Sequence, residues 1–133
     1  QDAADKALQC ANQLIQHLET WSDRRVRDGE PPLSFAIGLH AGSVIGGVIP
    51  AGSQSEYTVL GDAVNLASRL QSMCRRLDAN IVMSQEVLDL LPQDRMGADW
   101  VAKINATILG RAEPKNIIYL PSRPNLPRRA EPI

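Results

Sequence analysis

Hydrophobic positions divide the chain into helical and extended segments. From Ala3 to about Trp21, apolar side chains recur every three or four residues, which is the spacing of one face of a helix. The charged residues 23–32 end in two prolines and predict a loop. In SFAIGLHAG, residues 34–42, apolar side chains alternate with small or polar ones, so we expect a strand with one buried face.

The middle of the chain predicts a hairpin that leads into a helix. Glycines interrupt residues 43–52, so the first strand of the hairpin should be short or bulged; EYTVL, residues 56–60, should be the returning strand. Asp62 is placed to cap the helix that follows, because a carboxylate there can accept a free first-turn N–H. We expect this helix to reach about Arg76. Its predicted buried side chains are Val64, Ala67, Leu70 and Cys74.

The last third of the chain predicts strands around a short helix. NIVMS, residues 80–84, is typical of a strand, and Ser84 should cap a helix within QEVLDLL. Two more strands, at about 101–109 and 116–120, flank GRAEPK. We therefore expect an α+β fold, with an antiparallel sheet and helices on one face. This domain should cover residues 1–121, and the proline-rich residues 122–133 should form a disordered tail.

Composition narrows the class of protein. A chain of 133 residues with 44% hydrophobic and 22% charged residues is typical of one soluble globular domain. Its net charge of −1 gives no electrostatic footprint for nucleic acid, and no apolar run approaches the roughly 20 residues that span a membrane. Cys10 and Cys74 lack metal-ligand spacing, so we expect reduced, buried cysteines in a cytoplasmic protein.

Candidate chemistry lies in EYTVLGDAVNLASRL, residues 56–70. Asn65 and Arg69 are four residues apart and therefore share one face of the predicted helix, and Thr58 precedes them at the end of a strand. The planar, permanently charged guanidinium suits phosphate oxygens, and helix starts favour anions. A phosphorylated ligand is one interpretation of this turn. The spacing also fits an ordinary solvated helix face, and the nearby glycines could mark close strand packing.

Longer motifs carry a resemblance to a known family. IGLHAGSVIGGV followed by YTVLGDAVNLASRL resembles the catalytic domain of class III nucleotidyl cyclases, the adenylyl and guanylyl cyclase family. NIVMSQEVLDLL and ILGRAEPKNIIYL resemble later segments of the same domain, so the likeness runs in order over residues 3 to 121. The resemblance implies a ferredoxin-like, palm-type antiparallel sheet.

The resemblance also implies roles for particular residues. Asn65 matches the asparagine that orients the ribose, and Arg69 matches the arginine that stabilises charge on the α-phosphate as the 3′-hydroxyl displaces pyrophosphate. Thr58 falls at the purine-selecting position, where threonine goes with adenine, so ATP is the expected substrate. Arg111 matches a basic residue that contacts the triphosphate, although a hairpin-turn cation in solvent is the alternative. Leu109 departs from the lysine common in the family, and His40 is expected to belong to the packing.

The metal site of the family has no counterpart here. The family uses two divalent ions, Mg²⁺ or Mn²⁺, held by aspartates in motifs like F-x-D-I-x-G-F-T and K-x-x-G-D, and neither motif occurs in this chain. Asp2 and Asp5 match surface acids of the family and are not expected to be ligands. We therefore expect a fragment without the first strand, first helix and metal hairpin of the family fold. Such a fragment should not cyclise ATP alone.

Two functions remain open at this point. The first is part of an adenylyl cyclase, a phosphorus–oxygen lyase that converts ATP to 3′,5′-cyclic AMP and pyrophosphate in signal transduction. The family forms its site across a head-to-tail dimer, and this chain would supply the ribose- and phosphate-orienting half in a homodimer. The alternative is a non-catalytic cyclase-homology module that regulates or binds a partner. Retention of Thr58, Asn65 and Arg69 favours the enzyme.

Overall fold

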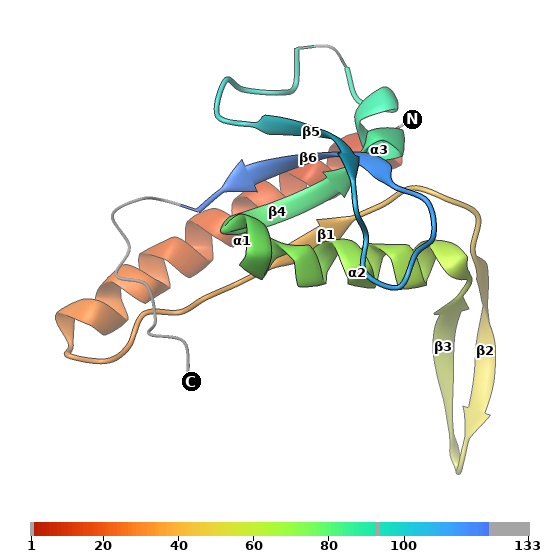
Figure 1. The fold of residues 1–133 in the computed structure, drawn as a ribbon. Coiled ribbons are helices and arrows are strands. Elements are labelled where there is room, and N and C mark those ends of the chain that lie inside the picture. Colours follow the sequence, from red (N-terminus) through yellow and green to blue (C-terminus); the bar gives the residue numbers. More distant parts are fainter. Residues whose placement is uncertain (1, 93, 123–133) are drawn as a thin grey trace.

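The computed structural model describes residues 2–92 and 94–122. Two long helices, a short one and six strands follow one another along the chain (Figure 1). In order they are α1 (Asp2–Arg27), β1 (Ile37–Leu39), β2 (Ile45–Ala51), β3 (Gln54–Leu60), α2 (Asp62–Leu77), β4 (Ala79–Ser84), α3 (Gln85–Asp89), β5 (Val101–Ala106) and β6 (Lys115–Pro121). The expected disordered tail lies outside the described residues except for Ser122.

Four of the strands form one sheet in the order β1-β4-β6-β5. β4 pairs antiparallel with β6, and β6 pairs antiparallel with β5. β1 runs parallel to β4, because the chain between them passes through the β2–β3 hairpin and α2 before it returns to the sheet. The predicted α+β fold with a mainly antiparallel sheet is confirmed, with this one parallel pair.

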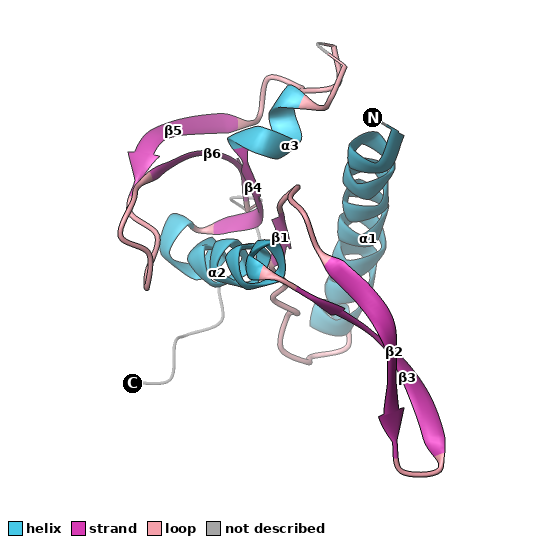
Figure 2. Cartoon of the chain, turned by 90° about the vertical axis from the view of Figure 1, so that its right-hand side faces the viewer, coloured by secondary structure: helices cyan, strands magenta, loops and turns pink. Residues whose placement is uncertain are grey.

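The two long helices cover opposite faces of the sheet. Ala11 and Ile15 of α1 pack against Ile81 of β4. Leu66 of α2 belongs instead to the cluster of Val82, the next residue of β4. Since successive side chains of a strand point to opposite faces, α1 and α2 lie on either side of the sheet, as Figure 2 shows. The prediction of helices on one face is therefore wrong: β4 is buried at every position and needs cover on both faces.

The β2–β3 hairpin forms a separate two-stranded sheet that projects from the rest of the molecule (Figures 1 and 2). Its register runs from Ile45 opposite Leu60 to Ala51 opposite Gln54 without a bulge. The hairpin was predicted correctly, but the expectation of a short or bulged first strand was wrong, because β2 has seven residues. Gly52, with φ of +65°, lies in the turn, where a left-handed conformation favours glycine.

The boundaries of the long helices differ from the prediction. α1 continues to Arg27, beyond the expected end at Trp21, and Ser22 is buried where its Oγ accepts a hydrogen bond from the Leu33 N–H over 2.9 Å. This contact ties the end of α1 to the loop that follows. Cys74 is buried as expected, but Cys10 is exposed on α1, and both thiols are free.

The start of α2 also departs from the prediction. Gly61, with φ of +148°, occupies the N-cap position, and Asp62 is the first helical residue without a side-chain capping bond. Val64 is exposed, whereas Leu66 and Met73 join the core. The helix therefore turns a slightly different face to the sheet than its sequence suggested. Within the described residues, no helix is long and apolar enough to cross a membrane.

Candidate functional site

One face of α2 carries the predicted ribose- and phosphate-binding residues. Gly61 allows the chain to turn sharply from β3 into α2, since its φ of +148° is disfavoured for other residues. Asn65 and Arg69 follow on the helix, both exposed to solvent. Their spacing of four residues places the amide and the guanidinium about one turn apart, as the sequence predicted.

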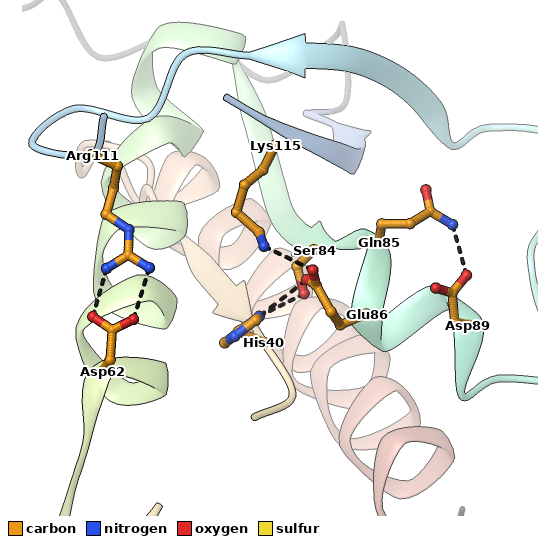
Figure 3. Close-up of polar contacts among 8 residues, drawn as sticks. All are labelled: His40, Asp62, Ser84, Gln85, Glu86, Asp89, Arg111 and Lys115. Atoms are coloured by element: carbon orange, nitrogen blue, oxygen red, sulfur yellow. Dashed lines mark hydrogen bonds and ion pairs between the residues drawn. The ribbon is translucent and has the colours of Figure 1, made fainter. Parts of the chain in front are cut away.

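The loop between β5 and β6 brings a second arginine to this face. Gly110 adopts a φ of +80°, and a Cβ at this position would lie 3.3 Å from Cζ and Nη2 of Arg69. The backbone of the loop thus lies against the Arg69 guanidinium. Arg111, the next residue, is fixed on the same helix by Asp62 (Figure 3). The structure therefore brings Arg111 to the helix that carries Asn65 and Arg69, although it lies more than 40 positions after them in the sequence.

The contact of Arg111 with Asp62 is bidentate. Nη1 donates to Oδ1 over 2.6 Å, and Nη2 donates to Oδ2 over 2.8 Å. The hydrogen bonds from Arg111 lower the pKa of the Asp62 carboxyl below its usual range, so Asp62 is ionised at neutral pH. The expected role of Asp62 as a helix cap is wrong because its oxygens face this arginine. No local pattern indicates this pair, because its members lie 49 residues apart.

Thr58 lies apart from the helix face, on the hairpin. It lies in β3, opposite Gly47 of β2, two residues before the strand ends at Leu60, and its side chain is half-buried. Its neighbours along the chain are exposed. The structure thus keeps the predicted base-selecting residue next to the start of α2, on the projecting hairpin. Its proposed role stays a prediction.

A polar cluster of His40, Ser84, Glu86 and Lys115 joins the end of β1 to β4, α3 and β6. His40, directly after β1, lies with its Nδ1 2.7 Å from the Oγ of Ser84 and 3.5 Å from Oε2 of Glu86 (Figure 3). Lys115, at the start of β6, donates from Nζ to Oε1 of Glu86 over 2.7 Å. Ser84 occupies the N-cap position of α3, as predicted, but its hydroxyl contacts His40 and makes no capping bond.

Burial sets the protonation of His40. Its side chain is only 9% exposed, and desolvation lowers the pKa of the imidazole, although Glu86 opposes the shift. A Cβ at Gly42 would lie 3.2 Å from the Nε2 of His40 and 2.9 Å from the Cβ of Ala63, so the ring sits close to the first turn of α2. The cluster was missed at the sequence level because its contacts join residues more than 25 positions apart.

Metal binding finds no support in the described residues. Nowhere do three or more His, Cys, Asp or Glu side chains come together in a way that could hold a metal ion. Asp62, at the start of the same helix, has both oxygens engaged by Arg111. The residues of this face therefore do not fit a divalent ion. Two guanidinium groups, an amide and a helix start instead suit a polyanion that also carries hydroxyl groups.

Comparison with known proteins gives a consistent set of similarities. Residues 1–120 match the family model described as the adenylate and guanylate cyclase catalytic domain. An adenylate cyclase of Anabaena cylindrica is 35% identical over 88 residues, which cover 63% of this chain and 18% of that protein. Adenylate cyclase 1 of Rhizobium meliloti is 31% identical over 85 residues, covering 64% of this chain and 13% of that protein. The chain thus spans less than a fifth of the length of these relatives.

Solved structures show the same fold. The guanylyl cyclase Cya2 superimposes with a TM-score of 0.73 at 24% identity, covering 95% of this chain and 63% of that one. The adenylyl cyclase CyaB from P. aeruginosa gives a TM-score of 0.65 at 26% identity, covering 84% of this chain and 56% of that one. The sheet and its helices are therefore arranged as in nucleotidyl cyclase domains.

Proposed function

This chain belongs to the family of adenylate and guanylate cyclase catalytic domains, and from that membership we propose that it is the ribose- and phosphate-orienting half of an adenylyl cyclase site. The whole enzyme would convert ATP to 3′,5′-cyclic AMP and pyrophosphate. One observation carries the proposal: Asn65 and Arg69 are exposed on one face of α2, and the loop with Arg111 is docked over that same face.

Each residue has a task in the reaction. The 3′-hydroxyl of the ribose loses its proton as its oxygen attacks the α-phosphorus, the bond from that phosphorus to the bridging oxygen breaks, and pyrophosphate leaves and takes up a proton. Negative charge on the phosphoryl oxygens increases in the transition state, where Arg69 can stabilise it. Arginines with this task are worth about 10³–10⁵ in rate in other phosphoryl transfers. The Asn65 amide would hold the ribose, and Arg111 would hold the outer phosphates.

ATP is the substrate we propose. Thr58 carries a hydroxyl that can both donate and accept a hydrogen bond, and it lies on β3 close to the turn that starts α2. An adenine presents both a donor and an acceptor on its base-pairing edge, which such a hydroxyl can satisfy. The relatives from Anabaena cylindrica and Rhizobium meliloti are named adenylate cyclases, which supports the same choice.

A second subunit completes the site in this proposal. The hairpin exposes large apolar side chains, among them Ile45 at 75%, Val48 at 66% and Tyr57 at 72%. Ile45 is three residues from Val48 in β2, so the two side chains point to opposite faces of the hairpin, and Tyr57 lies opposite Val48. Apolar side chains exposed on both faces of one element are uncommon on a monomer and favour an interface. We infer that a second copy packs head-to-tail against the hairpin, in the cytoplasm, where ATP is available. Any divalent ions would be held by residues outside the face described above.

A mixing assay tests the proposal. Cyclic AMP is measured from ATP with Mg²⁺ or Mn²⁺, first with this chain alone and then with a cyclase subunit that holds the metals but lacks its own arginine. We expect activity in the mixture. Arg69→Ala should then lower turnover by about 10³-fold or more, whereas Arg76→Ala, an exposed arginine further along α2, should leave it unchanged.

The opposite outcome is equally informative. If the mixed dimer forms, as size-exclusion chromatography can show, and produces no cyclic AMP, the chain does not supply a catalytic half. It would then act as a regulatory cyclase-homology module. If Arg69→Ala and Arg76→Ala give the same turnover, Arg69 has no part in the chemistry.

A further inference from the structure

The contact between Arg111 and Asp62 uses the groups that a phosphate would use. Both terminal nitrogens of Arg111 are engaged, at 2.6 and 2.8 Å from the two carboxylate oxygens (Figure 3). A guanidinium grips phosphate through the same pair of parallel bonds. Asp62 therefore occupies the part of Arg111 that a triphosphate would need.

Asp62 contributes little to the fold in this position. It makes no capping bond to α2, and its side chain is 72% exposed. Ion pairs this accessible to solvent add little to stability, because water and salt screen them. An anion with more negative charge than the Asp62 carboxylate can therefore displace it from Arg111.

A separate contact keeps the loop in place when the ion pair opens. The backbone of Gly110 packs against the Arg69 guanidinium, and its φ of +80° shapes the loop for this approach. Lys115, at the far end of the loop, is tied to Glu86 over 2.7 Å. Arg111 would therefore remain beside Arg69 after Asp62 releases it, close to where a polyphosphate would lie.

We propose that Asp62 is a positioning residue that holds Arg111 through the two bonds that nucleotide phosphates would otherwise take, and gives it up when the phosphates bind. The inference rests on the proposed function, since it requires a polyphosphate at Arg69 and Arg111. In the ion pair, the carboxylate offsets the charge of Arg111, whose loop lies against the Arg69 guanidinium. When a nucleotide binds, its phosphate oxygens replace the Asp62 carboxylate on Arg111. Because the ion pair must first break, the nucleotide binds more weakly than it would without Asp62.

The test is a double-mutant cycle on this chain with inorganic tripolyphosphate as the probe. Binding is followed by NMR through the backbone amide of Gly110, which detects millimolar affinities. We expect Asp62→Asn to tighten binding about two- to fivefold, the range expected for an exposed ion pair. Asp62→Glu should bind like the unmodified chain. In an Arg111→Gln background, Asp62→Asn should change nothing, because no ion pair is left to break.

Two results would overturn the proposal. If Asp62→Asn tightens tripolyphosphate binding equally with and without Arg111, Asp62 acts only as a nearby negative charge. Asp89→Asn measures how large such a general charge effect is, because the Asp89 carboxylate on α3 accepts a hydrogen bond from Gln85 and does not contact Arg111. Weaker binding by a correctly folded Asp62→Asn variant would mean that the carboxylate is a scaffold. Circular dichroism melting curves verify the fold of each variant.

The cyclic AMP assay and the double-mutant cycle together separate the role of Asp62 from the proposed cyclase function on which it rests. An active mixture in the cyclic AMP assay, together with a cycle that shows no coupling, rejects the role of Asp62 and retains the cyclase. An inactive mixture, together with no binding of tripolyphosphate or ATP by this chain, rejects both.

Discussion

β4 and the β2–β3 hairpin both contain branched apolar residues, but these residues are buried in β4 and exposed in the hairpin. All six residues of β4 are buried, whereas all seven residues of β2 are exposed. β4 pairs with a strand on each side and has a helix on each face, while the hairpin pairs only with itself. Apolar strand residues are thus the core of the domain in one place and an open surface in the other.

The buried strand stabilises the fold of the single chain, whereas the exposed hairpin is available for contact with another chain. An isolated two-stranded hairpin is marginally stable in water, and this one presents Ile45, Val48 and Tyr57 to solvent. Its apolar residues cannot be explained by the fold of one chain. They are explained if a second copy covers them, as proposed above.

A pair of isoleucines tests this contrast with the largest expected effect. Ile81 in β4 is 0% exposed, and Ile45 in β2 is 75% exposed. Ile81→Ala should lower the free energy of unfolding by about 2–5 kcal/mol, because it leaves a cavity in the core. Ile45→Ala should stay within about 0.5 kcal/mol. Urea denaturation at concentrations where the chain is monomeric measures both, and equal losses would show that the hairpin belongs to the core.

Two glycines give a second, smaller contrast. A Cβ at Gly38 in β1 would overlap the carbonyl oxygen of Ala67 and approach the backbone nitrogen of Gln71 to 2.5 Å, so α2 packs directly on the strand there. Gly47 in β2 has no neighbour within 4 Å of such a Cβ. Gly38→Ala should cost about 1–3 kcal/mol through overpacking.

The control glycine should respond differently. Gly47→Ala should be neutral or stabilise the strand slightly, since glycine in a strand interior loses more backbone entropy on folding. Thermal melting followed by circular dichroism compares the two variants. A stable Gly38→Ala protein would mean that α2 can shift away from β1.

The smallest effect concerns His40, which lies between β1 and the hairpin. Burial holds its pKa below the ordinary value of 6.5, so the unfolded chain binds its proton more readily than the folded chain. The stability it contributes is therefore present above pH 6.5 and is lost as the pH falls from 6.5 towards the folded pKa. His40→Gln should flatten this part of the stability profile.

Other groups should not obscure this measurement. The Asp62 and Glu86 carboxyls both have lowered pKa values, below ordinary values of 3.8 and 4.5, and they titrate at more acidic pH. Urea midpoints between about pH 7.5 and 6 are compared for the unmodified chain and His40→Gln; His17 is present in both, so the difference in slope reports His40. An unchanged slope in His40→Gln would show that the imidazole is not desolvated on folding.

Local patterns predicted the helices and strands well, but they predicted less well which side chains are buried. The spacing of Leu8, Ala11 and Ile15 predicted α1, and all three are buried. The same approach predicted that Val64 is buried, but it is exposed. A helical repeat indicates that one side of the helix is apolar, and it does not fix which residues lie at the centre of that side. Cys10 was misjudged for a similar reason, since residue type alone suggested burial.

The candidate site shows the same division. Asn65 and Arg69 could be placed on one face because they lie within a single helix. The position of Arg111 beside Arg69 depends on how the β5–β6 loop folds over α2. The partner of Asp62 was missed because the capping rule considers only the residues of one helix.

The helices, the strands and the cyclase family could be inferred from the amino-acid sequence, because periodicity and turn residues act over a few positions and the motifs lie within short segments. Which face of the sheet each helix covers, and which apolar strands stay exposed, followed from tertiary packing. It also joined Asp62 to Arg111 and His40 to Ser84. Such contacts link residues more than 40 positions apart, and they follow from how whole elements pack.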